Sequence, residues 1–226
     1  MTAGTVVLLR HARTAFNAAL RLQGQSDIPL DDVGRWQAEQ GAKALASAHR
    51  ATRVVTSDLG RAADTARAYG AAVGVEPTYD ARLRERSFGE WEGLTGDEIA
   101  VRWPEQHAAW RAGEEPTRAG AEAKVDVAAR MLAAVTEHAD ALEREDTLVV
   151  VSHGAAITLA VTALLGLDPA AWRGISGLHN VHWSHLHRSA PAAVPAWRLV
   201  AHNVGAGFPL DEWNAGPDWN LEPVSA

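Results

Sequence analysis

The sequence contains no cysteine, only two lysines and no long hydrophobic run. Without cysteine, disulfides, cysteine metal sites and thiol catalysis are excluded. The apolar stretches are too short to span a membrane, and the one near residue 6 lacks the length and the cleavage site of a signal peptide. We therefore expect a cytoplasmic protein.

The overall charge is acidic, with a formal net charge of −7. Such a balance argues against nonspecific nucleic-acid binding, which depends on a basic face. Because lysine is nearly absent, arginine supplies most of the positive charge, and its planar guanidinium suits bidentate phosphate contacts. An anionic substrate would need a local basic pocket within this acidic background.

The length and the hydrophobic pattern predict an α/β fold. The 226 residues, 47% of them hydrophobic, suffice for one full domain. Because predicted strands and helices alternate, we expect a three-layer sandwich with a mostly parallel central sheet and helices on both faces. The expected strands are 6–9, 53–56, 147–151, 181–186 and 197–201, and the expected helices are 36–47, 58–72, 125–142 and 155–165.

Two segments break this alternation. Residues 89–120 are rich in Trp, Glu and Gly, and we expect them to form a small helical cap insertion. Residues 209–226 are rich in Pro, Trp and Asn, which predicts an irregular C-terminal tail. We interpret residues 1–226 as a single domain that includes both segments.

Histidines follow two of the predicted strands. His11, preceded by Arg10, comes after the first strand, and His153 comes after residues 147–151. Ligands of open α/β sheets bind outside the carboxyl ends of the strands, so we expect these histidines to meet at one site. Arg61 adds a cation near a helix N-terminus, and Glu85 is a candidate general acid. Hydrolysis of a phosphate monoester needs such a set of cationic donors, a nucleophile and an acid.

Five ordered blocks of sequence resemble the histidine phosphatase superfamily, also called the phosphoglycerate mutase-like family. They are Leu8–Asn17 (LLRHARTAFN), Leu22–Leu30 (LQGQSDIPL), Thr56–Ala66 (TSDLGRAADTA), Leu83–Gly93 (LRERSFGEWEG) and Val149–Gly154 (VVVSHG). Trp197–Leu199 with Asn203 is similar to the closing strand of the family. One such block alone would be a weak signal, whereas five in the same order are a strong one.

This resemblance implies a phosphatase that acts through phosphohistidine. His11 is then the nucleophile and Glu85 the proton donor to the leaving oxygen. The residues that contact phosphate or line the substrate are Arg10, Asn17, Gln23, Gly24, Arg61 and His153. The resemblance implies no metal and no cofactor. The expected partner is a small phosphorylated metabolite of the phosphoglycerate or sugar-phosphate type, and a homodimer is left open.

Within the phosphatase branch, the sequences of three segments indicate one subfamily. The segment 124–130 (KVDVAAR), the helix after Ser57 and the strand at 197–199 are similar to a subfamily that acts on glucosyl-3-phosphoglycerate.

The sequence departs from the family pattern at two places. Ala12 replaces the usual glycine after His11, which is tolerated if φ stays negative there. The block usually read as Gly-Gly-Glu-Ser is Gly120–Ala123 (GAEA) here and lacks its serine.

Two other functions remain as alternatives. A cofactor-dependent phosphoglycerate mutase is disfavoured. By the resemblance, such mutases carry a longer insertion with an Arg-rich and Pro-rich stretch after the loop that bears the acid, whereas only a short segment without such a stretch separates Glu92 from Gly120 here. A catalytically silent protein that binds phosphorylated ligands is disfavoured, because His11 and Glu85 are both intact.

Two further groupings of residues are interpreted as without function. Ser152, His153 and Asp58 are the residue types of a hydrolase triad, but no G-x-S-x-G elbow occurs. Histidines also gather near the C-terminus, at positions 179, 182, 185 and 187. On a strand His185 and His187 share a face that His182 does not, so we expect no metal there.

Overall fold

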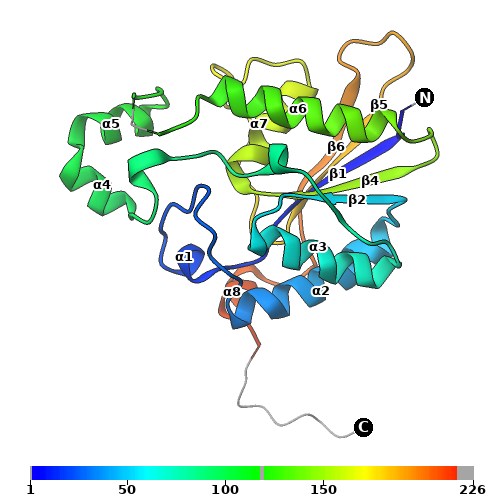
Figure 1. The fold of residues 1–226 in the computed structure, drawn as a ribbon, viewed down its shortest axis with the longest axis horizontal. Helices are drawn as coiled ribbons and strands as arrows, with labels where there is room; N and C mark the ends of the chain where they lie inside the picture. The colour runs from blue at the N-terminus through cyan, green and yellow to red at the C-terminus, as the bar shows by residue number, and fades with distance from the viewer. Residues whose placement is uncertain (1, 118–119, 218–226) are drawn as a thin grey trace, which may run out of the picture.

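The computed structural model describes residues 2–117 and 120–217 and is built on a six-stranded sheet (Figure 1). The strands are β1 (Thr5–Arg10), β2 (Arg53–Thr56), β3 (Thr78–Tyr79), β4 (Thr147–Ser152), β5 (Trp183–Arg188) and β6 (Trp197–Val204). Their order across the sheet is β3-β2-β4-β1-β5-β6. The first four strands in this order pair in parallel, whereas β5 and β6 pair antiparallel. The prediction of a mostly parallel sheet is confirmed.

The register of β1 and β4 brings the two histidine motifs to one edge of the sheet. The two strands are parallel neighbours, and Arg10 at the end of β1 is paired with Ser152 at the end of β4. His11 and His153 therefore follow their strands at adjacent positions.

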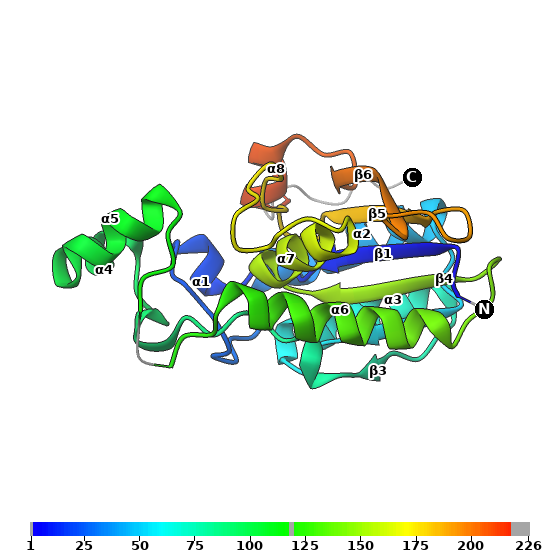
Figure 2. The ribbon, with the colours of Figure 1, turned by 90° about the horizontal axis from the view of Figure 1, so that it is seen from above.

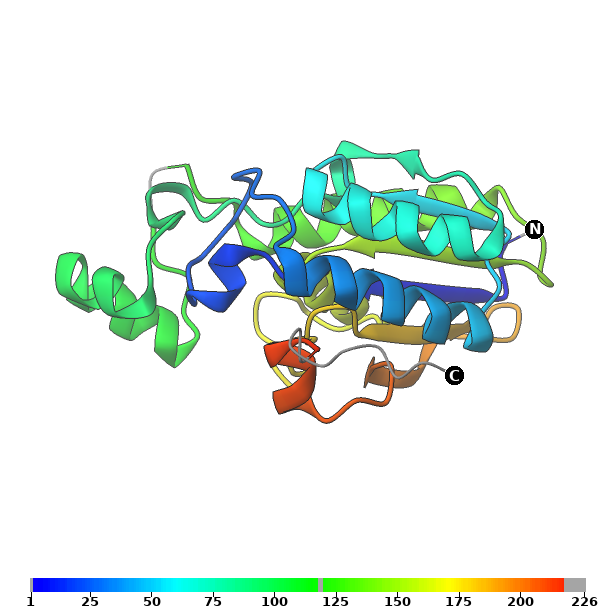
Figure 3. The same ribbon diagram turned by 90° about the horizontal axis from the view of Figure 1, so that it is seen from below.

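Helices cover both faces of the sheet, as the alternating pattern predicts (Figures 1 and 2). The helices α6 (Lys124–Asp140) and α7 (Gly154–Leu164) lie on one face, and α2 (Asp32–Ala48) and α3 (Gly60–Val73) lie on the other (Figure 3). Along β1, Val6 and Leu8 pack into the core beneath α6 and α7, and Val7 and Leu9 pack into the core beneath α2 and α3. A strand buried on both faces explains why the run is continuously apolar.

Residues 89–117 stand beyond the end of the sheet and contain short helices (Figures 1 and 2). They are η2 (Gly89–Trp91), α4 (Gly96–Arg102) and α5 (Pro104–Ala112). Trp91 and Ile99 are fully buried in a small apolar cluster of their own. Thr95 and Glu98 form a capping box at the start of α4, which satisfies backbone N–H groups at that end. The helices that the structure describes here lie between Gly89 and Ala112, and the role of the segment as a cap stays a prediction.

The prediction of an irregular tail at 209–226 is wrong for its first part. Residues Leu210–Ala215 form a helix, α8, while residues 218–226 lie outside the described residues. The helix is held by Trp213, which is 1% exposed and packs against Trp36 of α2. Gln37 of α2 donates a hydrogen bond of 2.8 Å to the Trp213 carbonyl oxygen. Tertiary packing thus stabilises this helix, whose six residues are too few to show a helical periodicity of apolar residues in the sequence.

Two short elements flank the site, α1 (Ala15–Ala18) and η1 (Ala81–Leu83). Across residues 2–117 and 120–217, no helix has both the length and the apolar character that a bilayer crossing requires.

Candidate active site

His11 and His153 meet at the edge of the sheet, as expected from their positions in the sequence. Their ring centroids are 5.1 Å apart, and both side chains are buried. The His11 backbone N–H donates to the Ser152 carbonyl oxygen at 2.9 Å. The Asn180 side-chain amide donates to the His11 carbonyl oxygen, also at 2.9 Å. The backbone that carries His11 is therefore fixed from two sides.

The His11 ring is held neutral, with one nitrogen free to react. Its Nδ1 lies 2.7 Å from the Ala12 carbonyl oxygen, which accepts only from N–H, so Nδ1 carries the proton. Burial first, and then the charges of Arg61 and Arg10, lower the His11 pKa well below its usual value. Nε2 of the neutral ring keeps its lone pair, which is what a nucleophilic imidazole requires.

Ala12 fits the tight turn after His11 without left-handed backbone. Its φ is not positive, so the substitution for glycine brings no strain of that kind. Its methyl group is fully buried, and its N–H donates to Thr65 Oγ1 at 3.0 Å. The sequence analysis expected alanine to be tolerated here if φ stays negative, and that condition is met.

Two arginines and His153 surround the reactive ring and leave polar atoms unused. Arg61 donates to the carbonyl oxygens of Gly24 and Ser26, and Arg10 donates to that of Leu178. The Nε atoms of both arginines and Nδ1 of His153 are buried and have no hydrogen-bond partner among the described residues. Each buried donor left unpaired costs about 1–3 kcal/mol, so the site is built for an external acceptor.

His153 is oriented by Ser57 and is neutral as well. Its Nε2 lies 2.9 Å from Ser57 Oγ. Burial, followed by the charge of Arg61, lowers the His153 pKa well below its usual value. When the Ser57 hydroxyl donates to Nε2, Nδ1 carries the proton and becomes a third donor for an anion. Ser57 does not occupy the cap position of α3, which belongs to Leu59, and Leu59 makes no side-chain cap bond.

Glu85 lies at the N-terminus of α7, beside the cationic groups. Its Oε1 accepts from the N–H groups of Arg86 (2.8 Å) and Ala156 (2.9 Å), and its Oε2 accepts from Ala155 (3.2 Å). The side chain is 8% exposed, and its charge interacts with those of Arg10 and Arg61. The positive end of the helix dipole holds this carboxyl group next to the histidines.

The loop from Thr14 to Gly24 places the remaining predicted residues. Thr14 caps α1, and Asn17 Oδ1 accepts from the Thr14 backbone N–H at 3.1 Å. Gln23 Oε1 accepts from the Thr14 hydroxyl at 2.9 Å. Gly24 has a φ of +55°, and a Cβ there would lie 1.9 Å from Glu92 Oε1, so only glycine fits. Gly24 contributes through its carbonyl oxygen, which holds Arg61.

Asn180, Thr14 and Ser57 support the site although the sequence analysis gave them no role in it. Thr14 and Asn17 have the three-residue spacing of a capping box, which is a usable signal. Asn180 lies between α7 and β5 in a segment without periodicity, and no pattern singles it out.

The other groupings weighed from the sequence do not form sites. Asp58 pairs with Arg84 and Ser152 Oγ donates to the Leu83 carbonyl oxygen, so the hydrolase triad is absent. His185 and His187 are adjacent on β5, with ring centroids 4.4 Å apart. Within the described ranges, no group of three or more His, Cys, Asp or Glu side chains is arranged to hold a metal ion.

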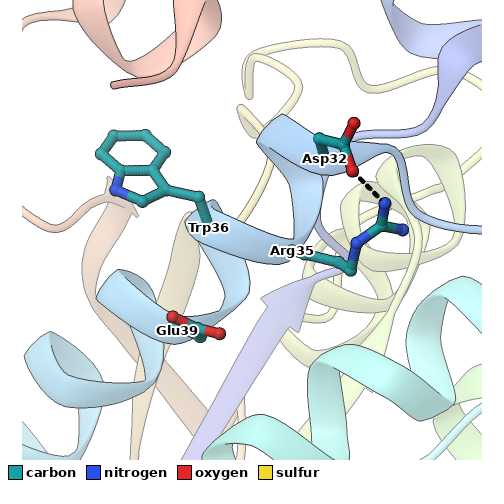
Figure 4. Close-up of a pocket in the computed structure, with 4 residues that line it drawn as sticks. All are labelled: Asp32, Arg35, Trp36 and Glu39. Atoms are coloured by element: carbon teal, nitrogen blue, oxygen red, sulfur yellow. Dashed lines mark hydrogen bonds and ion pairs between the residues drawn. The ribbon is translucent and has the colours of Figure 1, made fainter. Parts of the chain in front are cut away.

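Two hollows on the surface differ in their relation to His11. One lies on the outer face of α2, where Asp32 pairs with Arg35 while Trp36 points away from them (Figure 4). None of the predicted site residues lines it. The other, a cavity of about 500 Å³, is lined by Arg10 and Asn17 among others. Neither histidine lines it, but Arg10 places it next to the segment that carries His11.

Comparisons with known proteins agree with this geometry. Residues 6–203 match the histidine phosphatase superfamily (branch 1). The chain is 36% identical over 222 residues to the glucosyl-3-phosphoglycerate phosphatase of Mycobacterium tuberculosis, covering 95% of this chain and 96% of that protein. It is 34% identical over 212 residues to the probable phosphoglycerate mutase GpmB of Yersinia enterocolitica, covering 91% and 94%.

Solved structures give the same assignment. A mycobacterial glucosyl-3-phosphoglycerate phosphatase in complex with VO3 superposes with a TM-score of 0.81 at 35% identity, covering 89% of this chain and 99% of that one. The match to the family and the match to this solved structure both span most of the chain. The protein therefore belongs to branch 1 of the histidine phosphatase superfamily, as a phosphoric monoester hydrolase.

Proposed function

We propose that this phosphatase hydrolyses small phosphate monoesters in two steps through a phosphohistidine at His11. In the first step, His11 Nε2 attacks phosphorus, the ester P–O bond breaks and Glu85 gives its proton to the leaving oxygen. In the second, water attacks phosphorus, its proton passes to Glu85 and the P–N bond breaks. Inorganic phosphate and the free alcohol are the products.

The observation that carries the proposal is the arrangement of polar atoms around the neutral His11 ring. Among the described residues, Arg10 Nε, Arg61 Nε and His153 Nδ1 are buried without partners, and they lie beside a neutral imidazole whose Nε2 keeps its lone pair. A phosphoryl group bound there accepts from these donors while Nε2 faces phosphorus. Positioning and charge stabilisation of this kind supply most of the catalysis in phosphoryl transfer. The two arginines provide positive charge to the phosphoryl oxygens.

For the substrate, we propose an ester of the phosphoglycerate type, with glucosyl-3-phosphoglycerate as the leading candidate. The support is the 36–38% identity to proteins named as its phosphatases, which extends over more than nine-tenths of the chain. The probable phosphoglycerate mutase at 34% identity keeps transfer to a second hydroxyl as the competing function. Cytoplasmic location and a homodimer stay predictions.

The test is to trap the intermediate and to measure its dependence on His11. Wild-type enzyme quenched in alkali during turnover of 3-phosphoglycerate is expected to hold acid-labile phosphate on His11, detected by peptide mass spectrometry. His11→Ala is expected to lower kcat by about a thousandfold or more, because it removes the nucleophile. His187→Ala, which changes a histidine on β5 away from the site, is the control and is expected to keep full activity.

Three outcomes would contradict the proposal. Activity above a few per cent in His11→Ala would exclude the phosphohistidine mechanism. Conversion of 3-phosphoglycerate to 2-phosphoglycerate without release of phosphate would identify a mutase. Binding without any product from the full substrate panel would identify a silent binding protein.

A further inference from the structure

The cavity beside His11 has an unusually cationic lining. It has a volume of about 500 Å³ and lies between α1, the segment before β5 and the end of α8. No carboxylate occurs among the described residues that line it. The polar lining residues are three arginines and three asparagines, namely Arg10, Arg13, Arg21, Asn17, Asn180 and Asn214. In a chain with a net charge of −7, this is the local basic pocket that an anionic ligand requires.

The cavity shares residues with the proposed phosphate site. Arg10 and Asn17 line it and are also expected to contact the phosphoryl group. Asn180 Nδ2 bridges the two regions, because it donates to the His11 carbonyl oxygen at 2.9 Å and lies 3.3 Å from Asn17 Oδ1. With the phosphate at His11, an alcohol portion directed past Arg10 and Asn17 would enter this cavity.

Protein groups fix the Arg13 side chain and leave one of its nitrogen atoms available as a donor. Its Nε donates to both carboxylate oxygens of Asp31, at 3.0 and 3.3 Å, and its Nη1 donates to the Asn214 carbonyl oxygen. Nη2 has no hydrogen-bond partner among the described residues, and the side chain is 20% exposed. A guanidinium fixed in this way loses little further entropy when it binds an anion.

Arg21, which also lines the cavity, is fixed in the same manner. Its Nη1 and Nη2 donate to Glu98 at 2.8 and 3.1 Å, and Nη1 also donates to the Gly93 carbonyl oxygen at 2.6 Å. Both Nη atoms of Arg21 are thus engaged by protein groups, whereas Arg13 keeps Nη2 without a hydrogen-bond partner among the described residues. Arg13 is therefore the better position for a test.

We propose that this cavity binds a carboxylate on the alcohol portion of the substrate, with Arg13 as its principal charged donor. The enzyme then selects phosphate esters that carry a carboxylate, such as phosphoglycerates, over esters of neutral alcohols and sugars. A carboxylate matches the planar N–H groups of a guanidinium, which gives the interaction its specificity. The inference rests on the proposed function, because it assumes that the phosphate lies at His11.

The experiment measures binding without turnover, by isothermal titration calorimetry in the His11→Ala background. The two ligands are 3-phosphoglycerate and glycerol 3-phosphate, which differ in a carboxylate against a hydroxymethyl group. The first is expected to bind about tenfold or more tightly, and Arg13→Gln is expected to remove most of this advantage, as for loss of a charge-assisted hydrogen bond. The affinity for glycerol 3-phosphate is expected to change much less, by about twofold, because its hydroxymethyl group carries no charge and accepts only an ordinary hydrogen bond from Arg13.

Two further variants separate recognition from general damage. Arg67→Gln removes the same charge from the exposed surface of α3, where Arg67 pairs with Asp64, and is expected to change neither affinity. Arg13→Lys keeps the charge but not the planar fork and is expected to restore part of the preference. Equal affinity of the two ligands, or an equal loss for both in Arg13→Gln, would overturn the inference. If the trapping experiment finds no phosphohistidine, the proposed mechanism is overturned. The binding measurement is independent of that result, because it is made without turnover.

Discussion

At the scale of single residues, the site combines a neutral nucleophile with cationic neighbours. His11 is kept neutral by burial and by Arg61 and Arg10, whose charges make protonation of the ring unfavourable. The same arginines stabilise the charge of a phosphate monoester. One set of side chains thus keeps the lone pair of His11 available and holds the group that this lone pair attacks.

The role of Glu85 predicts a dependence on the leaving group. In Glu85→Gln we expect kcat/KM for 3-phosphoglycerate to fall by about a hundredfold or more, because its alkoxide needs a proton as it leaves. For p-nitrophenyl phosphate we expect a fall of less than about tenfold, because nitrophenolate leaves without an acid. Steady-state kinetics on both substrates check this. Glu90→Gln, at an exposed neighbouring position, serves as the control.

An equal loss of activity on both substrates would contradict Glu85 as the proton donor. It would indicate that the carboxyl group acts through structure, by holding the N-terminus of α7 through Ala155 and Ala156. The ratio of the two losses separates these roles, because damage to the fold affects every substrate.

At the scale of secondary-structure elements, the parts that position the site were predictable and the parts that support it were not. The strands β1 and β4 are continuous apolar runs, and each ends in a histidine motif, so their meeting follows from the geometry of parallel strands. Asn180 has no such signal, because its position depends on the path of the chain between α7 and β5. The helix α8 was missed because tertiary packing of Trp213 stabilises a segment of six residues.

The helix α8 connects the packing on α2 to the backbone of the nucleophile. Trp213 Nε1 donates to the Asn180 carbonyl oxygen at 2.9 Å, and the Asn180 side chain donates to the His11 carbonyl oxygen. Trp213 also packs against Trp36 and Phe208. Loss of this indole therefore affects both the stability of the fold and the support of His11.

We expect Trp213→Ala to lower the free energy of unfolding by about 3–5 kcal/mol, the usual effect of truncating a buried aromatic residue. Trp213→Phe keeps much of the packing and removes the hydrogen bond, so we expect a loss of about 1–2 kcal/mol. Urea unfolding followed by circular dichroism measures both. Trp172→Ala is the matched control because Trp172 is 36% exposed, and a loss as large as that of Trp213→Ala would contradict the role given to α8.

At the scale of the whole molecule, buried and half-buried histidines that stay neutral link stability to pH. Burial is the largest cause that lowers the pKa values of His11, His49, His153, His182 and His185. In the unfolded chain each of these groups takes up a proton near pH 6.5, whereas in the folded protein it stays neutral to lower pH. The unfolded state therefore binds more protons below pH 6.5, so stability falls as the pH falls.

The carboxylates act in a lower pH range, so the two effects can be separated. Hydrogen bonds from Arg82 lower the Asp80 pKa to about 2, and its contribution is lost only as the pH falls from about 4 to about 2. Burial, with the neighbouring His49 and His187, lowers the His185 pKa to about 4. Glu98, Glu122 and Glu137 also have lowered pKa values, from an ordinary value of 4.5, so the upper part of the interval, from pH 6.5 to about pH 5.5, reports mainly on the histidines.

We expect the free energy of unfolding to decrease between pH 6.5 and pH 4, with each buried neutral histidine contributing at most about 1.4 kcal/mol per pH unit. His185→Leu removes one of these groups, so the decrease is expected to become shallower by up to that amount while activity is kept, because His185 lies on β5 away from the active site. Urea titrations at half-unit pH intervals measure the slope, with His107→Leu on α5 as the control. An unchanged slope in His185→Leu would show that His185 accepts its proton in the folded state, and a stability that rises towards pH 4 would contradict the linkage as a whole.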